Sequence, residues 1–379
     1  MYGAVDQRPV FAGYLSVSIE GLEPSTEELK MLEHEAIVGV VLFQRNVASS
    51  EQLAALVDKL RVVKPDLIID IDNEGFDIGT QLRQGVWRCP HDDFPPVPSQ
   101  WTIQQQYNEN LDKGLEMAYQ AGYTIAKQLA AYGITPLATV LDSNPQNIGP
   151  FPRPVADAGT QTVFDAAPGA SSDAVVAEES IVKAPTKAVA SSWIIAGIAR
   201  SFGHNSEDVA TLANYKAQGL IAGGVAQIAL KHFPDHGAAD ADSHVSIPRD
   251  NRDHAEVLAW AEATYGSLPG KLKKVMPAHV CYTNAGKSMD APIASYDPFW
   301  LGKIREIMGD STLIISDCAS MGAVDQTTMP ENLAKMTNSE APIDIVLYCN
   351  QKSEQVLELL NSVIHRPTVK TAARVQKLK

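Results

Sequence analysis

The chain has 379 residues, of which 45% are hydrophobic and 20% are charged, a composition typical of a folded globular protein. Its formal net charge of −14, with no basic stripe, argues against a nucleic-acid surface, because phosphate binding needs clustered lysines and arginines. The chain start shows no signal-peptide pattern and no apolar run reaches the roughly 20 residues of a membrane span, so we expect a cytoplasmic protein that contacts no membrane.

Short apolar runs rich in β-forming residues alternate along the chain with longer segments of helical periodicity. The expected strands are YLSVSI (14–19), IVGVVLF (37–43), DLIIDID (66–72), ITPLATVLD (134–142), VAQIALKHF (225–233), KVMPAHV (274–280), TLIISD (312–317) and DIVLYCN (344–350). The helix candidates are 49–63, 107–131, 207–222, 297–308 and 353–364. Alternating strands and helices imply parallel pairing, and eight strands favour an α/β fold with a (β/α)8 TIM-type barrel.

One region interrupts this alternation after the fourth strand. Residues 143–188 are rich in Pro, Gly, Ala, Ser and Asp, which predicts a long irregular insertion rather than a separate domain. The last segment, 353–379, is predicted to be a helical tail. We therefore predict one barrel domain over residues 1–379.

Polar residues stand at the ends of the apolar runs. They are Asp72, Asp142, Lys231, His232, His279, Asp317 and Asn350. In a barrel these positions meet at the C-terminal mouth, where active sites of this fold lie. A single such residue could be a helix cap, but so many together indicate a functional site. We interpret His279 as a packing or supporting residue rather than an acid.

The four cysteines are widely spaced and form no C-x-x-C pair. They are Cys89, Cys281, Cys318 and Cys349. This spacing favours reduced, mostly buried thiols over a disulfide framework or a metal site.

The polar stretch KHFPDHGAADADSH (231–244) allows two chemical interpretations. Three histidines with Asp240 and Asp242 are ligand types suited to zinc or iron, but no H-x-H or H-E-x-x-H spacing fixes a ligand set. The other interpretation is acid/base chemistry, because Asp242 and His244 are two residues apart and share one face of an extended loop. An ionised aspartate there would orient the imidazole and stabilise its protonated form.

Hydrolysis of an acetal such as a glycosidic bond would use that pair. It requires protonation of the leaving oxygen and stabilisation of an oxocarbenium-like centre. Asp317, a carboxylate at a strand end, could attack this centre and form a covalent intermediate, while a histidine supplies and retrieves the proton.

The same stretch resembles the K-H-F-P-G-H-G-x-x-x-x-D-S-H signature of the β-N-acetylhexosaminidases of glycoside hydrolase family 3. Supporting matches are VGVVLFQRN, IDNEG, RSFG (200–203), VMPAHVCY, SDCASMGA and DIVLYCN, which follow the family's order. The resemblance covers roughly residues 13–365.

This resemblance implies a retaining hydrolase that releases N-acetylglucosamine from the non-reducing end of β-linked chains. Its typical substrates are cytoplasmic 1,6-anhydro-muropeptides in cell-wall recycling, and it needs no metal or organic cofactor. It assigns Asp317 as nucleophile, His244 as acid/base and Asp242 as its partner. The substrate-binding residues that it implies are Asp72, Arg200, Lys231 and His232, with Arg83 as the nearest counterpart of a further arginine. Apart from the resemblance, we expect Met321 to line the mouth of the barrel as an apolar wall.

The sequence also departs from the family pattern. DNEGFDIGTQLR stands where the family has D-Q-E-G-G-R-V-x-R, with Phe76 and Asp77 in place of Gly-Arg. Asp235 replaces a glycine of the catalytic loop, where it loses glycine's conformational freedom and adds an acid near the Asp242–His244 pair. We expect these departures to affect substrate preference and catalytic rate more than the fold.

Three alternatives therefore stay open at this point. A histidine acid/base would let phosphate approach, which would make the enzyme a phosphorylase. A sugar-binding sensor could keep the pocket and lose the rate. A metal-dependent hydrolase would use the histidines of 231–244 as ligands.

Overall fold

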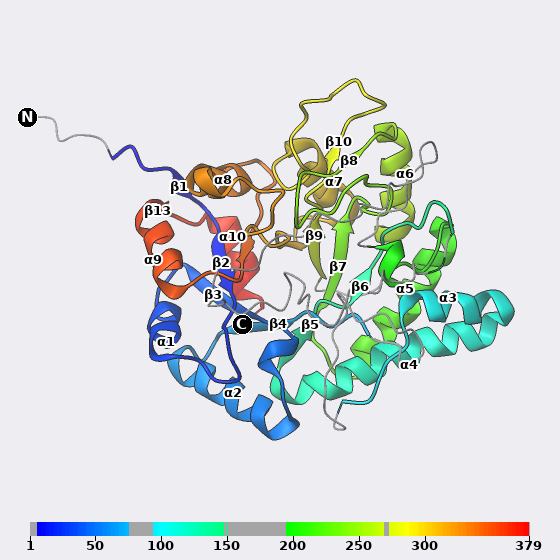
Figure 1. Cartoon of the computed structure of the whole chain (residues 1–379), viewed down its shortest axis with the longest axis horizontal. Coiled ribbons are helices and arrows are strands. Elements are labelled where there is room, and N and C mark those ends of the chain that lie inside the picture. Colours follow the sequence, from blue (N-terminus) through cyan, green and yellow to red (C-terminus); the bar gives the residue numbers. More distant parts are fainter. Residues whose placement is uncertain (1–5, 76–93, 148, 150–194, 269–272, 379) are drawn as a thin grey trace, which may run out of the picture.

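The computed structural model describes residues 6–75, 94–147, 149, 195–268 and 273–378 (Figure 1). Two larger parallel sheets form its centre. The first has the order β12-β2-β3-β4-β5, whose strands are Ile345–Tyr348, Tyr14–Val17, Ile37–Leu42, Ile68–Ile71 and Ile134–Pro136. The second has the order β11-β9-β7-β6, whose strands are Leu313–Ile314, Lys273–Pro277, Ile228–Phe233 and Thr139–Val140. Two short pairs are β1 (Val10–Phe11) with β13 (Ile364–His365) and β8 (Arg249–Asp250) with β10 (Cys281–Tyr282).

The two sheets approach each other at both ends. A parallel bridge between Ile315 and Ile345 joins the edges next to β11 and β12. At the other end the chain itself passes from β5 to β6, with Leu137 N–H donating to the Ile71 carbonyl at 2.8 Å. Each of the eight predicted apolar runs contains a strand. Because these strands are hydrogen-bonded into two sheets and not into one closed sheet, closure of the (β/α)8 barrel stays a prediction.

Ten α-helices within the described ranges surround these sheets (Figure 1). They are α1 (Thr26–Leu32), α2 (Ser50–Val63), α3 (Gln100–Glu109), α4 (Leu111–Leu129), α5 (Ser206–Ala222), α6 (His254–Tyr265), α7 (Pro298–Met308), α8 (Met329–Thr337), α9 (Ser353–Asn361) and α10 (Val369–Gln376). Local sequence explains several starts: Ser49 accepts the N–H of Gln52 at α2, and Asp297 caps α7, where Pro298 takes the first position.

The helix predicted over 107–131 is wrong as one element. Asn110 has extended backbone (φ −153°, ψ 107°) and its side chain accepts the N–H of Lys113, so one helix ends and α4 begins there. An N-cap of this kind satisfies orphan backbone donors, which favours a break over a continuous helix. Of the predicted insertion, residues 150–188 lie outside the described ranges; the predicted tail contains α9 and α10.

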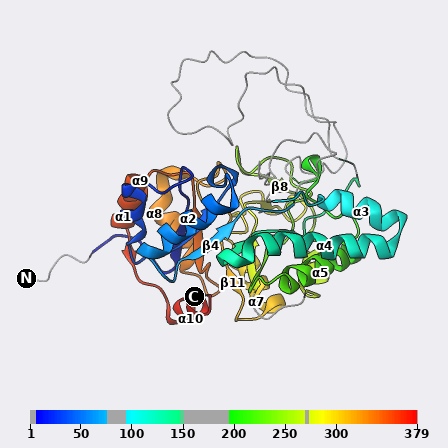
Figure 2. The ribbon, with the colours of Figure 1, turned by 90° about the horizontal axis from the view of Figure 1, so that it is seen from below.

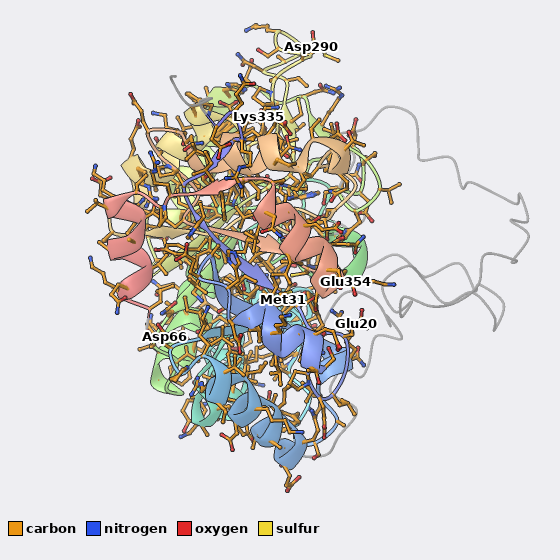
Figure 3. The ribbon with its side chains drawn as sticks, turned by 90° about the vertical axis from the view of Figure 1, so that its left-hand side faces the viewer. Glu20, Met31, Asp66, Asp290, Lys335 and Glu354 are labelled. Carbon is orange, nitrogen blue, oxygen red and sulfur yellow. The ribbon has the colours of Figure 1, made fainter. Side chains whose placement is uncertain are left out.

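Two of these helices pack closely against each other. α4 and α5 lie side by side (Figures 1 and 2), and a Cβ at Gly122 would overlap the carbonyl of Lys216. Glycine is therefore required for this approach. On the opposite side of the molecule, Met31 of α1 is buried in the core whereas Glu354 of α9 is exposed (Figure 3).

A buried ion pair crosses from one sheet to the other. Asp70 lies two residues after Ile68 on β4, so these two side chains share one face of that strand. In the same way, Lys274 shares one face of β9 with Met276. Ile68 and Met276 belong to one apolar cluster contributed by both sheets. The Lys274 ammonium binds the Asp70 carboxylate, and the two residues are 1% and 3% exposed.

We expect Lys274→Met to lower the free energy of unfolding by about 3–5 kcal/mol, because it leaves the Asp70 carboxylate buried without a partner. The double variant Asp70→Leu/Lys274→Met should regain most of this loss. Urea unfolding followed by circular dichroism measures both. Lys59→Met, which removes the exposed Lys59–Glu23 pair, serves as control and should cost no more than about 1 kcal/mol. Equal effects of Lys274→Met and Lys59→Met would contradict the prediction.

Candidate active site

Four of the described site residues predicted from sequence lie at or just after the carboxyl ends of strands. Asp72 directly follows β4, Lys231 and His232 end β7, and Asp317 follows β11. This is the edge at which ligands of parallel α/β folds bind. Arg83, the remaining arginine candidate, lies outside the described residues.

A buried carboxylate, Glu74, holds two of the predicted sugar-binding cations. Arg200 donates from Nε and Nη2 to its two oxygens at 2.7 Å each. Lys231 Nζ lies 2.5 Å from Glu74 Oε1 and 2.8 Å from Asp72 Oδ1. Burial alone would raise the pKa of Glu74, but the charges of Arg200 and Lys231 lower it well below its usual value. Glu74 belongs to the IDNEG motif, but the sequence pattern indicates a role only for Asp72, so the part that Glu74 plays is visible only in the structure.

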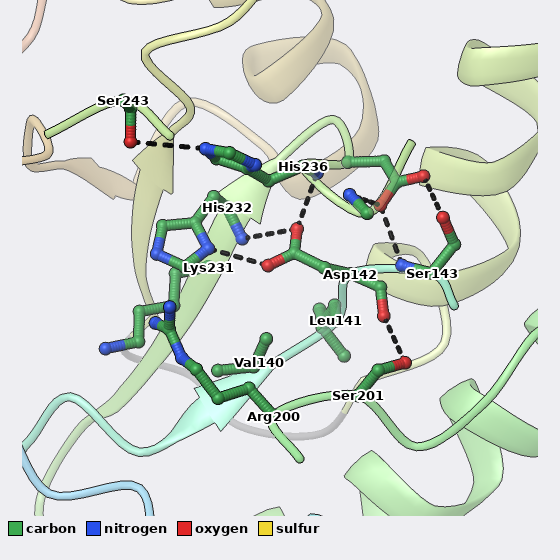
Figure 4. A network of polar contacts seen from close by, with 12 residues as sticks. Val140, Leu141, Asp142, Ser143, Arg200, Ser201, Lys231, His232, His236 and Ser243 are labelled. Atoms are coloured by element: carbon green, nitrogen blue, oxygen red, sulfur yellow. Dashed lines mark hydrogen bonds and ion pairs between the residues drawn. The ribbon is translucent and has the colours of Figure 1, made fainter. Parts of the chain in front are cut away.

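A second buried carboxylate, Asp142, orients two histidines (Figure 4). It accepts from the backbone N–H groups of His232 at 3.1 Å and His236 at 2.8 Å. Its other oxygen lies 2.6 Å from His232 Nδ1. Burial opposes ionisation, but His232 lowers the pKa of Asp142. Because Asp142 occupies Nδ1, the ring of His232 has only Nε2 to offer a substrate.

His236 connects this carboxylate to the loop that carries His244. Burial, with the nearby charge of His232, lowers the pKa of His236 to about 4, so its ring is neutral at pH 7. Its Nε2 lies 3.3 Å from the hydroxyl of Ser243, the residue before His244 (Figure 4).

The predicted Asp242–His244 pair is formed. His244 Nδ1 lies 2.7 Å from Asp242 Oδ1, which also accepts the His244 backbone N–H at 2.9 Å. The His244 side chain is 34% exposed and the Asp242 side chain 23%, so the pair faces the solvent side of the site. Burial alone would raise the pKa of Asp242. The hydrogen bond from His244 outweighs this effect, so the pKa of Asp242 is lowered and its carboxylate is ionised.

The loop bearing His244 is bound to the turn that follows Asp317. Gly322 N–H donates to the His244 carbonyl at 3.1 Å, and Ala323 N–H donates to Ser243 at 3.0 Å. A Cβ at Gly322 would come within 2.6 Å of the His244 carbonyl, so this contact requires glycine. Met321 lies in the same turn and is 7% exposed; its role as an apolar wall stays a prediction.

Asp317 is surrounded by histidines. Burial would raise its pKa, but His232, His279 and His244, in that order, lower the pKa of Asp317 well below its usual value. The N–H of Cys318 donates to its carboxylate at 2.7 Å. His279 is fully buried between the Ser295 hydroxyl at 2.8 Å and the Cys318 carbonyl at 3.2 Å, which agrees with a supporting residue.

Asp235 does not need the conformational freedom of the glycine that it replaces. It is fully buried, and it is not among the described residues with positive φ. It accepts from Ser143 N–H at 2.7 Å and from Gly237 N–H at 2.9 Å, and it pairs with Arg252 at 2.7 Å. Burial raises the pKa of Asp235 while Arg252 opposes that shift. Asp235 therefore fixes the start of the loop to a neighbouring strand end, and none of its hydrogen bonds reaches the Asp242–His244 pair.

The arrangement suits displacement at a carbon bearing two oxygens. An ionised carboxylate, Asp317, lies near a histidine whose second nitrogen is held by Asp242, which supplies a nucleophile and a proton carrier. Within the described ranges, no group of three or more His, Cys, Asp or Glu side chains could hold a metal ion. No helix of the described chain is long and apolar enough to span a bilayer.

Comparison with known proteins places this chain among glycosidases. A model described as "Glycosyl hydrolase family 3 N terminal domain" matches residues 168–378. The chain is 30% identical to a Beta-hexosaminidase of Methylobacillus flagellatus, over 96% of this chain and 88% of that protein. It is also 30% identical to one of Methylococcus capsulatus, over 89% and 84% respectively. NagZ from Neisseria gonorrhoeae in complex with N-trifluoroacetyl-D-glucosamine matches with a TM-score of 0.72 at 27% identity, over 99% of this chain and 91% of that chain.

Asp142→Asn should lower kcat about 100-fold on 4-nitrophenyl N-acetyl-β-glucosaminide, because the amide cannot hold His232 and His236 as the carboxylate does. Asp240→Asn makes the same change on an exposed residue that accepts only the Arg249 backbone N–H at 2.7 Å, and should keep kcat within about two-fold. Equal activity of the two variants would show that the Asp142 charge does not position the site.

Proposed function

The chain belongs to glycosyl hydrolase family 3, and we propose that it is a retaining exo-β-N-acetylglucosaminidase acting on the non-reducing ends of β-linked glycans. The Asp242–His244 pair beside an ionised Asp317 carries this proposal, because the two provide both partners of a double displacement. The N-trifluoroacetyl-glucosamine bound to the Neisseria gonorrhoeae structure supports an N-acylated glucosamine as the sugar.

In the first step the Asp317 carboxylate attacks the anomeric carbon and the glycosidic C–O bond breaks. His244 gives its proton to the leaving oxygen, so the aglycone departs as a neutral alcohol. The low pKa of Asp317 favours this role, since the nucleophile must be ionised while the acid is still protonated.

In the second step water attacks the glycosyl–Asp317 ester. His244 takes the proton from that water, the ester bond breaks, and N-acetylglucosamine leaves with its original configuration. Asp242 holds Nδ1 throughout, which keeps Nε2 directed at the reacting oxygen and stabilises the imidazolium.

The sugar would be held by side chains that the structure brings together at the strand ends. Asp72 and Lys231, 2.8 Å apart, offer an acceptor and a donor to neighbouring hydroxyls. Arg200 and His232 are each fixed by a buried carboxylate, so they meet the sugar in a set orientation.

The proposal also includes the closed barrel and the natural substrate. The Ile315–Ile345 bridge and the chain passage from β5 to β6 support closure of the two sheets. The family resemblance of the 231–244 stretch supports cytoplasmic 1,6-anhydro-muropeptides of cell-wall recycling as the substrate.

We expect Asp317→Ala to lower kcat/KM about 1,000-fold or more on every substrate, because both steps need the carboxylate. His244→Ala should lose about 100-fold or more on an oligosaccharide but far less in bond cleavage of the 4-nitrophenyl glycoside, whose leaving group needs no proton. Steady-state and burst kinetics separate the two steps. Asp325→Ala, at an exposed helix cap, is the control and should stay within about two-fold. Equal losses of His244→Ala on both leaving groups would exclude it as the acid.

Mass analysis of the products from an N-acetylglucosaminyl-1,6-anhydro-muropeptide tests the bond and the acceptor together. We expect free N-acetylglucosamine in both phosphate and phosphate-free buffer. N-acetylglucosamine 1-phosphate, formed faster as phosphate rises, would instead make the enzyme a phosphorylase. Tight binding without any release would identify a sugar sensor.

A further inference from the structure

Two cysteines, Cys318 and Cys349, lie beside each other next to Asp317. Cys318 is the next residue in the chain, and Cys349 directly follows β12. The backbone N–H of Cys349 donates to Cys318 Sγ at 3.3 Å. Cys318 Sγ also lies 3.0 Å from the Ser320 hydroxyl. We call Cys318 and Cys349 the thiol pair.

The backbone on both sides keeps this pair together. Ala319 N–H donates to the Leu347 carbonyl at 2.7 Å, and Leu347 N–H donates to the Ser316 hydroxyl at 2.9 Å. These two bonds, one to the main chain and one to a side-chain hydroxyl, hold Cys318 beside Cys349 at the end of β12.

The surroundings of the pair make one thiol reactive. Hydrogen bonding by Cys349 lowers the pKa of Cys318 to about 7, and the charge of Arg45, on the 3-10 turn Gln44–Asn46, interacts with both cysteines. Cys318 is partly exposed, whereas Cys349 is 1% exposed. By contrast, burial raises the pKa of Cys281, and a buried thiol of that kind is inert.

We propose that Cys318 is a site of reversible oxidation by hydroperoxides, and that its oxidation joins it to Cys349 in a disulfide that switches the enzyme off. A partly exposed attacking cysteine beside a buried resolving cysteine is the arrangement that such sites use. Its inhibitory effect rests on the proposed role of Asp317, whereas formation of the disulfide does not.

The chemistry balances with hydrogen peroxide as the oxidant. The Cys318 thiolate attacks one peroxide oxygen, the O–O bond breaks, and the departing hydroxide takes a proton to leave as water. The sulfenic acid that remains on Cys318 is attacked by the Cys349 sulfur. The S–O bond then breaks, a second water leaves with the Cys349 proton, and two thiols and one peroxide have become one disulfide and two waters. A dithiol reductant reverses the change by thiol exchange.

Formation of this bond must disturb the nucleophile. A disulfide brings its two sulfurs to about 2.05 Å, well inside the contact distance of two thiols that are not bonded. Cys318 is joined to Asp317 by the peptide bond and by its N–H, which donates to the carboxylate at 2.7 Å. A displacement of about 1 Å at a reacting group can cost about 100-fold in rate, so we expect at least about ten-fold inhibition.

The test treats the full-length protein with hydrogen peroxide, removes the oxidant with catalase and assays 4-nitrophenyl N-acetyl-β-glucosaminide with and without dithiothreitol. We expect at least about ten-fold loss, recovered by dithiothreitol. Non-reducing peptide mass spectrometry should show the Cys318 peptide linked to the Cys349 peptide. Cys318→Ser should keep its own untreated activity within about two-fold after peroxide, whereas Cys281→Ser should behave as the unaltered protein.

Several results would overturn the proposal. Equal peroxide sensitivity in Cys318→Ser would place the damage elsewhere, and linkage of Cys318 to Cys89 or Cys281 would reject Cys349 as its partner. Linked peptides with full activity would overturn the inhibition and leave the proposed function intact. An untreated enzyme without glycosidase activity would overturn the proposed function, while the linked peptides alone would still decide whether the thiol pair is oxidised.

Discussion

The buried carboxylate of Asp142 is the interaction on which the geometry of the site depends. An ionised carboxylate without water costs several kcal/mol unless donors surround it. Here the donors are two backbone N–H groups and one imidazole, all from His232 and His236 at the end of β7. Satisfying this charge fixes two neighbouring strand ends relative to each other and sets both imidazole rings. Through His236 and Ser243 the same carboxylate reaches the loop that carries His244.

Charge in the rest of the site follows the same rule. Although the chain carries a net charge of −14, Glu74 gathers Arg200 and Lys231 around one buried carboxylate. A neutral sugar gives such cations no partner of its own, so protein carboxylates must neutralise them. Asp317 differs because its neighbours are histidines, which stabilise its charge without an ion pair to a lysine or arginine that would have to be broken before it could attack.

Much of the fold and part of the site could be predicted because their signals are local. The eight apolar runs have strand periodicity and coincide with strands, and Asp242 and His244 are close enough in sequence for their pairing to be expected. The break at Asn110 could not be predicted, because the helical periodicity continues through this residue and only the hydrogen bond of its side chain to Lys113 N–H ends one helix and begins the next. The buried role of Asp235 could not be predicted, because its partner Arg252 and its contact Ser143 lie on other segments.

The sequence by itself determined the strand and helix alternation, the pairing of Asp242 with His244 and the place of Asp317 after a strand, because periodicity and short spacings are properties of neighbouring residues. Only the tertiary structure decided how buried charges are shared: which carboxylate holds Arg200 and Lys231, which one orients His232, and that Cys318 touches Cys349 across 31 residues of chain. These contacts arise where separate strands end beside one another. Their partners are chosen by distance and burial in the folded state, and no local pattern in the chain records either quantity.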